Sequence, residues 1–160
     1  MGRKNKLQKF AEVLSFPNVY ECYNFEDQQL IGAGMTPVDL RGKWNEKHFG
    51  NNNPITLELA CGGWENTQGL GKKDPAHKFL GVDIKRNRIW KGAKLALAEE
   101  LNNAAFLRTR IEIIPTFFDP GEVDELWITF ADPFPRPSKE NRRLTSAFFN
   151  NQYRRILKPG

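Results

Sequence analysis

Residues 55–65 read ITLELACGGWE, an apolar run that ends in a turn of small residues. A short apolar run before a turn that contains glycine is typical of a buried β-strand, here expected at Ile55–Ala60. A second strand is expected at KFLGVD, residues 78–83, which ends in an acid. Two such strands joined by a connection long enough for a crossover predict a parallel βαβ unit.

The alternation continues toward the end of the sequence. Residues 86–101 carry apolar side chains at four-residue spacing, which predicts the clearest helix of the chain. Strands are also expected at 104–110 and 122–130, and helices at 64–73 and 146–157. Strands that alternate with helices predict an α/β fold with a parallel, doubly wound sheet.

Residues 1–54 differ from the rest of the chain. The first 16 residues are expected to form a basic arm or short helix, and residues 17–54 show no steady hydrophobic period. We therefore expect two parts: a basic N-terminal arm with a helical or loop segment over 1–54, and the α/β domain over 55–160.

Composition limits the class of protein. A chain of 160 residues has room for one domain with a hydrophobic core. No apolar run approaches the ~18 residues that cross a membrane, and no leader-type segment follows the basic start. Cys22 and Cys61 are expected to be buried, reduced thiols of a cytoplasmic protein. His48 and His77 are expected at the surface, and no cluster at metal-ligand spacing predicts a metal.

Basic residues fall into three clusters on a chain of net charge +5. The clusters lie within residues 3–9, 85–94 and 136–143. Each is compatible with a solvated face, but three together favour a polyanionic partner, of which nucleic acid is the commonest.

Ligands of open α/β sheets bind beyond the carboxyl ends of the strands. The turn around Gly62 follows the first strand, and Asp83 ends the second about twenty residues later. Glycine lets a backbone approach a nucleoside closely, and the acid accepts hydrogen bonds from ribose hydroxyls. The turn lacks the G-x-G-x-x-G pattern, and Glu58 lies at the end of the first strand. A carboxylate there repels a pyrophosphate and suits the cationic end of S-adenosylmethionine.

A proline-rich loop, FADPFPR at 130–136, directly follows the fourth expected strand. Asp132 in this loop is expected to face the methyl group of a cofactor held by the first two strands. The basic residues that follow are placed to hold a phosphate backbone beside the site: Arg136, Lys139, Arg142 and Arg143.

At these residues the sequence resembles the bacterial tRNA (guanine-N7-)-methyltransferases. The matching stretches are residues 58–65, 81–85, 102–112 and 130–145, and the Asp-Pro loop with its arginine pair is the most specific of them. The resemblance implies a Rossmann-like class I methyltransferase sheet of which strands 1–4 of seven are present, in the order 3-2-1-4. It also implies S-adenosylmethionine as cofactor and tRNA as partner, with no membrane, no metal, and a monomeric or homodimeric chain.

The same resemblance implies roles for single residues. Glu58 and the backbone near Gly62 meet the methionine end of the cofactor, Asp83 meets the ribose, and Arg110 lies near the adenine. Asp132 is placed at the reaction centre, as catalytic and cofactor-contacting residue. The four basic residues of 136–143 contact the RNA, and Arg136 corresponds to a substrate-contacting lysine of the family.

The sequence also departs from the family pattern. Two family glycines are Ala60 and Trp64 here, and the indole of Trp64 either turns outward or fills the methionine pocket. The later strands of the family do not follow Gly160, so a fragment, a truncated copy or completion by a partner is expected, with an exposed fourth strand. Two other functions stay open: a catalytically impaired RNA-binding relative, and a methyltransferase with another substrate.

Overall fold

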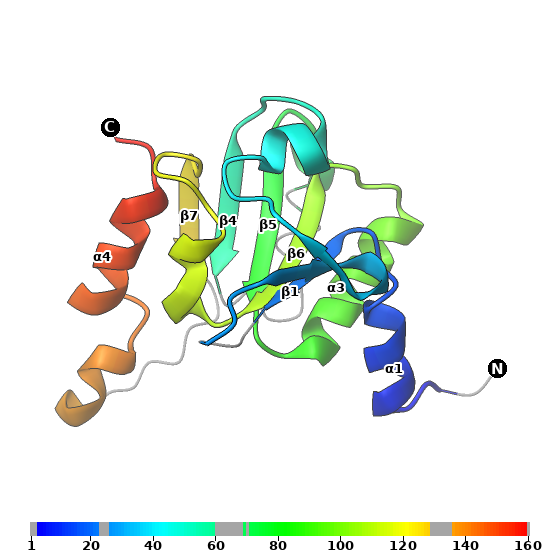
Figure 1. Cartoon of the computed structure of the whole chain (residues 1–160), viewed down its shortest axis with the longest axis horizontal. Helices are drawn as coiled ribbons and strands as arrows, with labels where there is room; N and C mark the ends of the chain where they lie inside the picture. Colours follow the sequence, from blue (N-terminus) through cyan, green and yellow to red (C-terminus); the bar gives the residue numbers. More distant parts are fainter. Residues whose placement is uncertain (1–2, 23–25, 60–68, 70, 129–135, 160) are drawn as a thin grey trace.

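The computed structural model describes residues 3–22, 26–59, 69, 71–128 and 136–159 (Figure 1). Three α-helices, seven strands and four short helical turns have assigned bounds within these residues. The α-helices are α1 (Lys6–Val13), α3 (Arg86–Ala98) and α4 (Ala147–Ile156). The strands are β1 (Val19–Cys22), β2 (Leu30–Gly32), β3 (Thr36–Val38), β4 (Ile55–Leu59), β5 (Lys78–Asp83), β6 (Ala104–Thr109) and β7 (Glu125–Ile128). The turns are η1 (Ala33–Met35), η2 (Trp44–Phe49), η3 (Ile111–Thr116) and η4 (Pro137–Arg142).

The strands form one sheet in the order β3-β2-β1-β6-β5-β4-β7. The four strands expected from the sequence are its β6-β5-β4-β7 part, all parallel, so the predicted 3-2-1-4 order is confirmed. Parallel neighbours bring their carboxyl ends to one edge of the sheet, where Figure 1 shows the arrowheads of β4, β5 and β6. We call this the carboxyl edge.

The expected strand count was wrong, because three strands come from residues 17–54. β1 runs parallel to β6, with Glu21 opposite Arg108, and β2 and β3 extend the sheet in antiparallel fashion. All four residues of β1 are buried, and β2 and β3 have three residues each. Strands this short, or buried on both faces, show no alternation in the sequence. Of the three, only β1 pairs with one of the predicted strands, β6.

The other elements agree with the sequence in type and differ in length. The expected helix at 86–101 ends at Ala98, and the expected strand at 122–130 begins at Glu125. Ser146 precedes the last helix as its cap residue. Most of the helix expected at 64–73 lies outside the described residues.

Two apolar clusters cover the two faces of the sheet. On one face α1 and α3 pack over β6, with Val13, Ile89 and Phe106 in a single buried cluster. On the other face the larger cluster joins η2, η3 and α4 to the central strands, with Trp44 and Tyr153 among its members. Because strand side chains alternate, each polar residue of a central strand belongs to one of these faces.

β7 is the last strand of the sheet in the described part of the chain. Its residues are exposed or half-buried, and 40% of Trp127 is exposed. The expected exposed fourth strand is therefore found. An apolar strand in this position is a site for pairing with another chain.

Candidate functional site

The carboxyl edge brings the two acids of the first and second expected strands together. Glu58 pairs in register with Gly81, and Asp83 lies two residues farther along the same neighbouring strand. Side chains two residues apart share a face, so both carboxylates lie on the face covered by α1 and α3. They are 2% and 6% exposed, respectively. Burial of two ionisable side chains at a strand end is costly, which favours a role in binding.

Asp83 is held in one orientation by the start of α3. One carboxylate oxygen, Oδ1, accepts a hydrogen bond from the backbone N–H of Lys85 at 3.0 Å. The other, Oδ2, lies 3.5 Å from Nη1 of Arg88. This arrangement fixes the carboxylate at the end of β5, where a ribose of a nucleoside ligand would donate to it.

A third acid of this edge escaped the sequence analysis. Glu21 of β1 is buried and lies in register with Arg108, which is in turn in register with Asp83. Its carboxylate accepts two hydrogen bonds from Arg86, from Nε at 3.1 Å and from Nη2 at 3.2 Å. The signal in the sequence was a charged residue inside an otherwise apolar run, VYEC at 19–22. Because no strand was predicted there, the sequence could not place Glu21 at the edge of the sheet.

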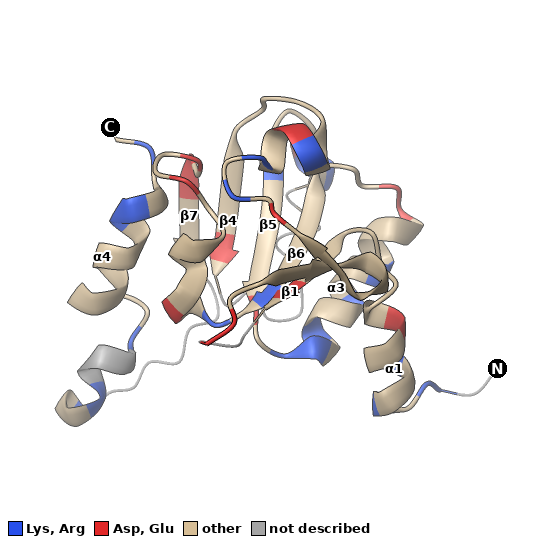
Figure 2. Cartoon of the chain, in the orientation of Figure 1, with Lys and Arg blue, Asp and Glu red and all other residues tan. Residues whose placement is uncertain are grey.

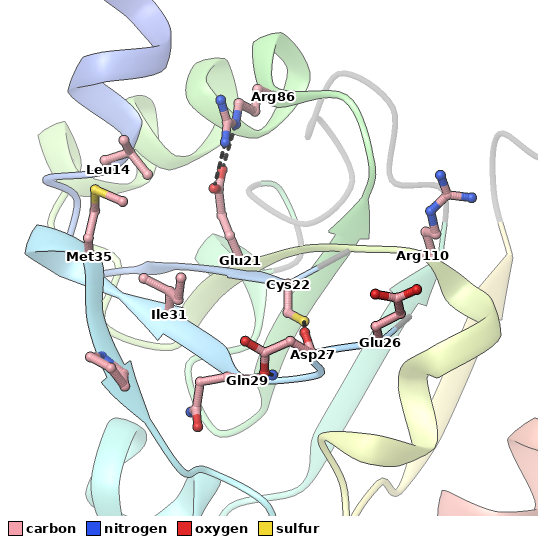
Figure 3. Close-up of a pocket in the computed structure, with 11 residues that line it drawn as sticks. Leu14, Glu21, Cys22, Glu26, Asp27, Gln29, Ile31, Met35, Arg86 and Arg110 are labelled. Atoms are coloured by element: carbon pink, nitrogen blue, oxygen red, sulfur yellow. Dashed lines mark hydrogen bonds and ion pairs between the residues drawn. The ribbon is translucent and has the colours of Figure 1, made fainter. Parts of the chain in front are cut away.

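Arg110 follows β6 directly and lines a cleft beyond β1 rather than the space between the two acids. The cleft has a volume of about 800 Å³ and lies between the C-terminal end of α1, β1–β3 and the first residue of α3. Among the described residues that line it, neither Glu58 nor Asp83 is present. Figure 3 shows Arg110 at its rim, with Glu21 and Arg86 on the far wall.

The remaining candidates follow β4 and β7 in the sequence. Gly62 and Asp132, as well as Ala60 and Trp64, lie outside the described residues. Of the basic run, Arg136 and Lys139 are exposed and Arg143 is half-buried, and the side chain of Arg142 is outside the described part. The turn η4, which carries most of this run, lies next to α4 at the lower left of Figure 1.

The other two basic clusters also meet in the structure. α1 packs against α3, and Nζ of Lys9 donates to the side chain of Asn87 at 3.2 Å. Lys9 and Lys94 both lie over the ring of Trp90, with Nζ at 4.6 and 4.9 Å from its centre. Figure 2 shows Lys and Arg on the first turns of α1 and α3 and on η4, all toward the carboxyl edge. Two clusters that are separate in sequence thus meet where α1 packs against α3, and the third lies on η4, which contacts α4.

The acidic side chains at the carboxyl edge fit S-adenosylmethionine. Asp83 offers a buried acceptor for ribose hydroxyls, and Glu58 offers a buried negative charge for an ammonium or sulfonium group. A dinucleotide pyrophosphate would instead meet two carboxylates without a neutralising cation of its own. Within the described ranges, no three His, Cys, Asp or Glu side chains group as a metal site. No described helix has the length and apolar character of a membrane span.

The likeness to solved structures defines the class of fold. The antibiotic-resistance methyltransferase Kmr aligns with 79% of this chain and 65% of its own, at a TM-score of 0.60 and 20% sequence identity. At that identity the likeness shows the fold alone, the open α/β sheet of methyltransferases.

The sequence comparisons then give the family. The family described as "Putative methyltransferase" matches residues 52–160. The tRNA (guanine-N(7)-)-methyltransferase of Christiangramia forsetii is 44% identical over 158 residues, which are 99% of this chain and 68% of that protein. The Bacteroides thetaiotaomicron protein of the same name is 48% identical over 157 residues, 98% of this chain and 59% of that protein. The chain belongs to the tRNA (guanine-N(7)-)-methyltransferase family. It spans about three fifths of the length of the Bacteroides relatives that it matches.

Proposed function

We propose that this protein transfers a methyl group from S-adenosylmethionine to N7 of a guanine in tRNA. The observation that carries the proposal is the pair of buried acids, Glu58 and Asp83, on one face at the carboxyl edge of a methyltransferase sheet. The family supplies the reaction and the RNA class. Residues 55–160 carry the cofactor site in this proposal, and residues 1–54 add the basic arm together with the strands that widen the sheet.

Each acid has a distinct task in the proposed cofactor site. Asp83 accepts hydrogen bonds from the ribose hydroxyls, and its orientation is already set by Lys85 and Arg88. Glu58 compensates the positive charge of the methionine end, beside the backbone near Gly62. Arg110 lies toward the adenine side. When bound, the cofactor supplies an electrophilic methyl group.

The reaction requires little from the protein beyond the positioning of the guanine and the methyl donor. Guanine N7 has a free lone pair, so no general base is needed, and correct placement of the purine supplies most of the rate. Methylation leaves a positive charge on the base. Asp132 is the residue that we expect to stabilise that charge and to hold the guanine edge.

The basic clusters provide the RNA contacts in this proposal. Arg136, Lys139, Arg142 and Arg143 bind phosphates beside the reaction centre, and the first turns of α1 and α3 bind phosphates on the other side. Contacts of this kind position the RNA without reading its sequence. We further propose a cytoplasmic protein, as monomer or homodimer, that uses no metal.

A methyl-transfer assay on unmodified tRNA tests the proposal. We expect labelled methyl groups to appear as 7-methylguanosine and expect Asp132→Ala to lower the rate at least ~100-fold, since a preorganised charge at the reaction centre is lost. Trp64→Gly, assayed beside it, reports whether the indole obstructs the methionine pocket.

The alternative, an impaired RNA-binding relative, has its own signature. Such a protein binds tRNA but shows no transfer in any variant. Transfer to another RNA but not to tRNA would support a methyltransferase with a different substrate.

A further inference from the structure

The cleft beyond β1 has no role in the proposed reaction. It is about 800 Å³ in volume, within the usual range of ~300–1,000 Å³ for sites that hold small molecules. It lies beside the carboxyl ends of two parallel strands, β1 and β6, where ligands of such sheets bind. Apart from Arg110, the described residues that line it have no role in the proposed cofactor site.

One wall of the cleft is apolar and exposed. Leu14, Ile31, Met35 and Pro37 contribute to it. Met35 is 61% exposed, although it is one of the largest apolar side chains of this region. Its φ is +60°, a left-handed conformation that is uncommon outside glycine. A strained, exposed methionine at the rim of a cleft favours contact with a flat apolar surface.

The opposite wall holds a preorganised cation. Arg86 donates from Nε and Nη2 to Glu21, and its guanidinium lies 5.2 Å from the centre of the Phe10 ring. These contacts fix the plane of the guanidinium and leave the N–H groups of Nη1 outside the bonds to Glu21. Figure 3 shows the Arg86–Glu21 pair, joined by dashed lines, among the residues that line the cleft.

The floor of the cleft carries an acceptor. Asp27 is exposed, and its Oδ1 accepts from the backbone N–H of Gln29 at 3.3 Å. The hydrogen bond orients the carboxylate, and its second oxygen remains an acceptor for a ligand. Carboxylates accept hydrogen bonds from the amino groups at base edges.

These features together point to one chemical class. We infer that the cleft binds an unpaired nucleobase with an exocyclic amino group, supplied by the RNA substrate at a position other than the methylated guanine. The inference rests on the proposed function for the RNA partner. The base lies against Met35 and Pro37, and its amino group donates to Asp27. Unpaired, splayed bases are the part of RNA that proteins read in this way.

The direction in which Asp27→Asn changes the tRNA affinity tests the inference. Loss of one negative charge by itself strengthens binding to a polyanion, so a non-specific effect raises tRNA affinity. Asp39→Asn is the matched control, because Asp39 is an exposed acid that pairs with Lys43 and does not line the cleft. We expect Asp27→Asn to weaken tRNA binding about fivefold or more, the loss that follows when one base contact is removed. Asp39→Asn should leave tRNA affinity equal or higher.

Met35→Ala is the second variant, and it keeps the net charge. We expect it to lower tRNA affinity about threefold through lost contact with the base, with unchanged thermal stability because the side chain is exposed. Tight tRNA binding by both Asp27→Asn and Met35→Ala, equal to that of the unmodified chain, would overturn the inference.

Calorimetry with the monophosphates of adenosine, guanosine, cytidine and uridine separates the sources of the ligand. The three with amino groups should bind more tightly than uridine monophosphate, also in the presence of saturating S-adenosylhomocysteine. Competition with S-adenosylhomocysteine would assign the cleft to the cofactor site and overturn the inference. Nucleotide binding together with an unaltered tRNA affinity in Asp27→Asn would assign the cleft to a free nucleotide, and this result would also overturn the inference. S-adenosylhomocysteine affinity tests the proposed function separately, since Asp27 and Met35 lie outside the acid pair.

Discussion

The two edges of the sheet both carry buried charges, but they use them differently. At the amino edge, where β4, β5 and β7 begin, the carboxylate of Glu122 accepts from three backbone N–H groups. Its Oε1 accepts from Gly42 at 2.8 Å and from Asp119 at 2.9 Å, and its Oε2 accepts from Trp44 at 3.3 Å. The acid therefore ties the loop before η2 to the loop before β7.

Two further charged side chains at the amino edge also bind loops of the chain. Lys78, which is fully buried, donates to the side chain of Asn45 and, at 3.0 Å, to the carbonyl of Asn51. Asp124 accepts from the backbone N–H of Ile55 at 2.7 Å and pairs with Lys158, also at 2.7 Å. Each of these groups is bound to a loop or terminus of its own fold.

At the carboxyl edge Asp83 and Glu21 are more deeply buried than the acids of the amino edge, and they interact with residues at the start of α3. Arg88 lies 3.5 Å from Asp83, beyond hydrogen-bond distance and partly in solvent. Burial of a charge therefore does not by itself mark a binding site. The charges that tie loops together at the amino edge stabilise the fold, and we propose that Glu58 and Asp83, at the edge where ligands of such sheets bind, also contact the cofactor.

Glu122→Ala gives the largest effect that follows from this distinction. It leaves three backbone N–H groups without their acceptor, so we expect the free energy of unfolding to fall by about 2–3 kcal/mol. S-adenosylhomocysteine affinity should stay within about twofold of the unmodified chain, because the two edges lie at opposite ends of the strands. Denaturant unfolding and calorimetry measure the two quantities. Glu122→Gln, which keeps one acceptor oxygen, should lose less stability; a large loss of cofactor affinity in either variant would break the distinction.

Acid should destabilise the chain through His48. Burial lowers the pKa of His48 to about 4 from its usual 6.5, and its Nδ1 lies 2.6 Å from the hydroxyl of Tyr20. The unfolded chain therefore binds the proton more readily, and stability falls as the pH drops from about 6.5 toward 4, by about 2 kcal/mol. His48→Gln keeps a hydrogen-bonding group and does not titrate. Equal pH dependence of thermal unfolding in both chains over that interval would contradict the assignment.

The smallest effect is expected from the basic run at residues 136–143. Replacing both Arg142 and Arg143 with Ala should leave stability unchanged and reduce the salt dependence of tRNA binding. The slope of log affinity against log salt should decrease in magnitude by about 1.5, since each lost phosphate contact removes about 0.7–0.9. Filter binding at several salt concentrations measures it, with Arg154→Ala and Arg155→Ala in α4 as the charge-matched control. An unchanged slope would identify the run as solvated surface.

Much of the fold could be predicted because its parallel strands have a recognisable pattern in the sequence. The runs at 55–60 and 78–83 are apolar, are followed by turns, and occupy neighbouring central positions in the sheet. β2 and β3 could not be found in this way, because three residues carry no period and because β2 pairs with β1 and β3 pairs with β2, outside the predicted strands. The same limit hid Glu21, whose importance depends on the strand that holds it.

The environment of individual side chains also could not be predicted from the sequence. His48 was expected at the surface, but the structure makes it half-buried, with its ring packed edge-on against Tyr20, Trp44 and Phe49. A π-helical turn, which no sequence period indicates, places it there. The acids of the cofactor site were predicted by residue type and spacing, and the structure brings Glu58 and Asp83 to one edge. Their roles remain predictions.

Titration of S-adenosylhomocysteine into the chain, its Asp83→Asn variant and its Asp39→Asn variant tests the central proposal most directly. The exchange removes the charge of the expected ribose acceptor while keeping its shape. We predict measurable binding by the unmodified chain, a loss of about tenfold or more in Asp83→Asn, and no change in Asp39→Asn, because a hydrogen bond to a charged group contributes about 1.5–3 kcal/mol. Thermal unfolding of all three should coincide. Absence of binding by the unmodified chain, or equal binding by Asp83→Asn, would contradict the proposal that this edge holds the methyl donor.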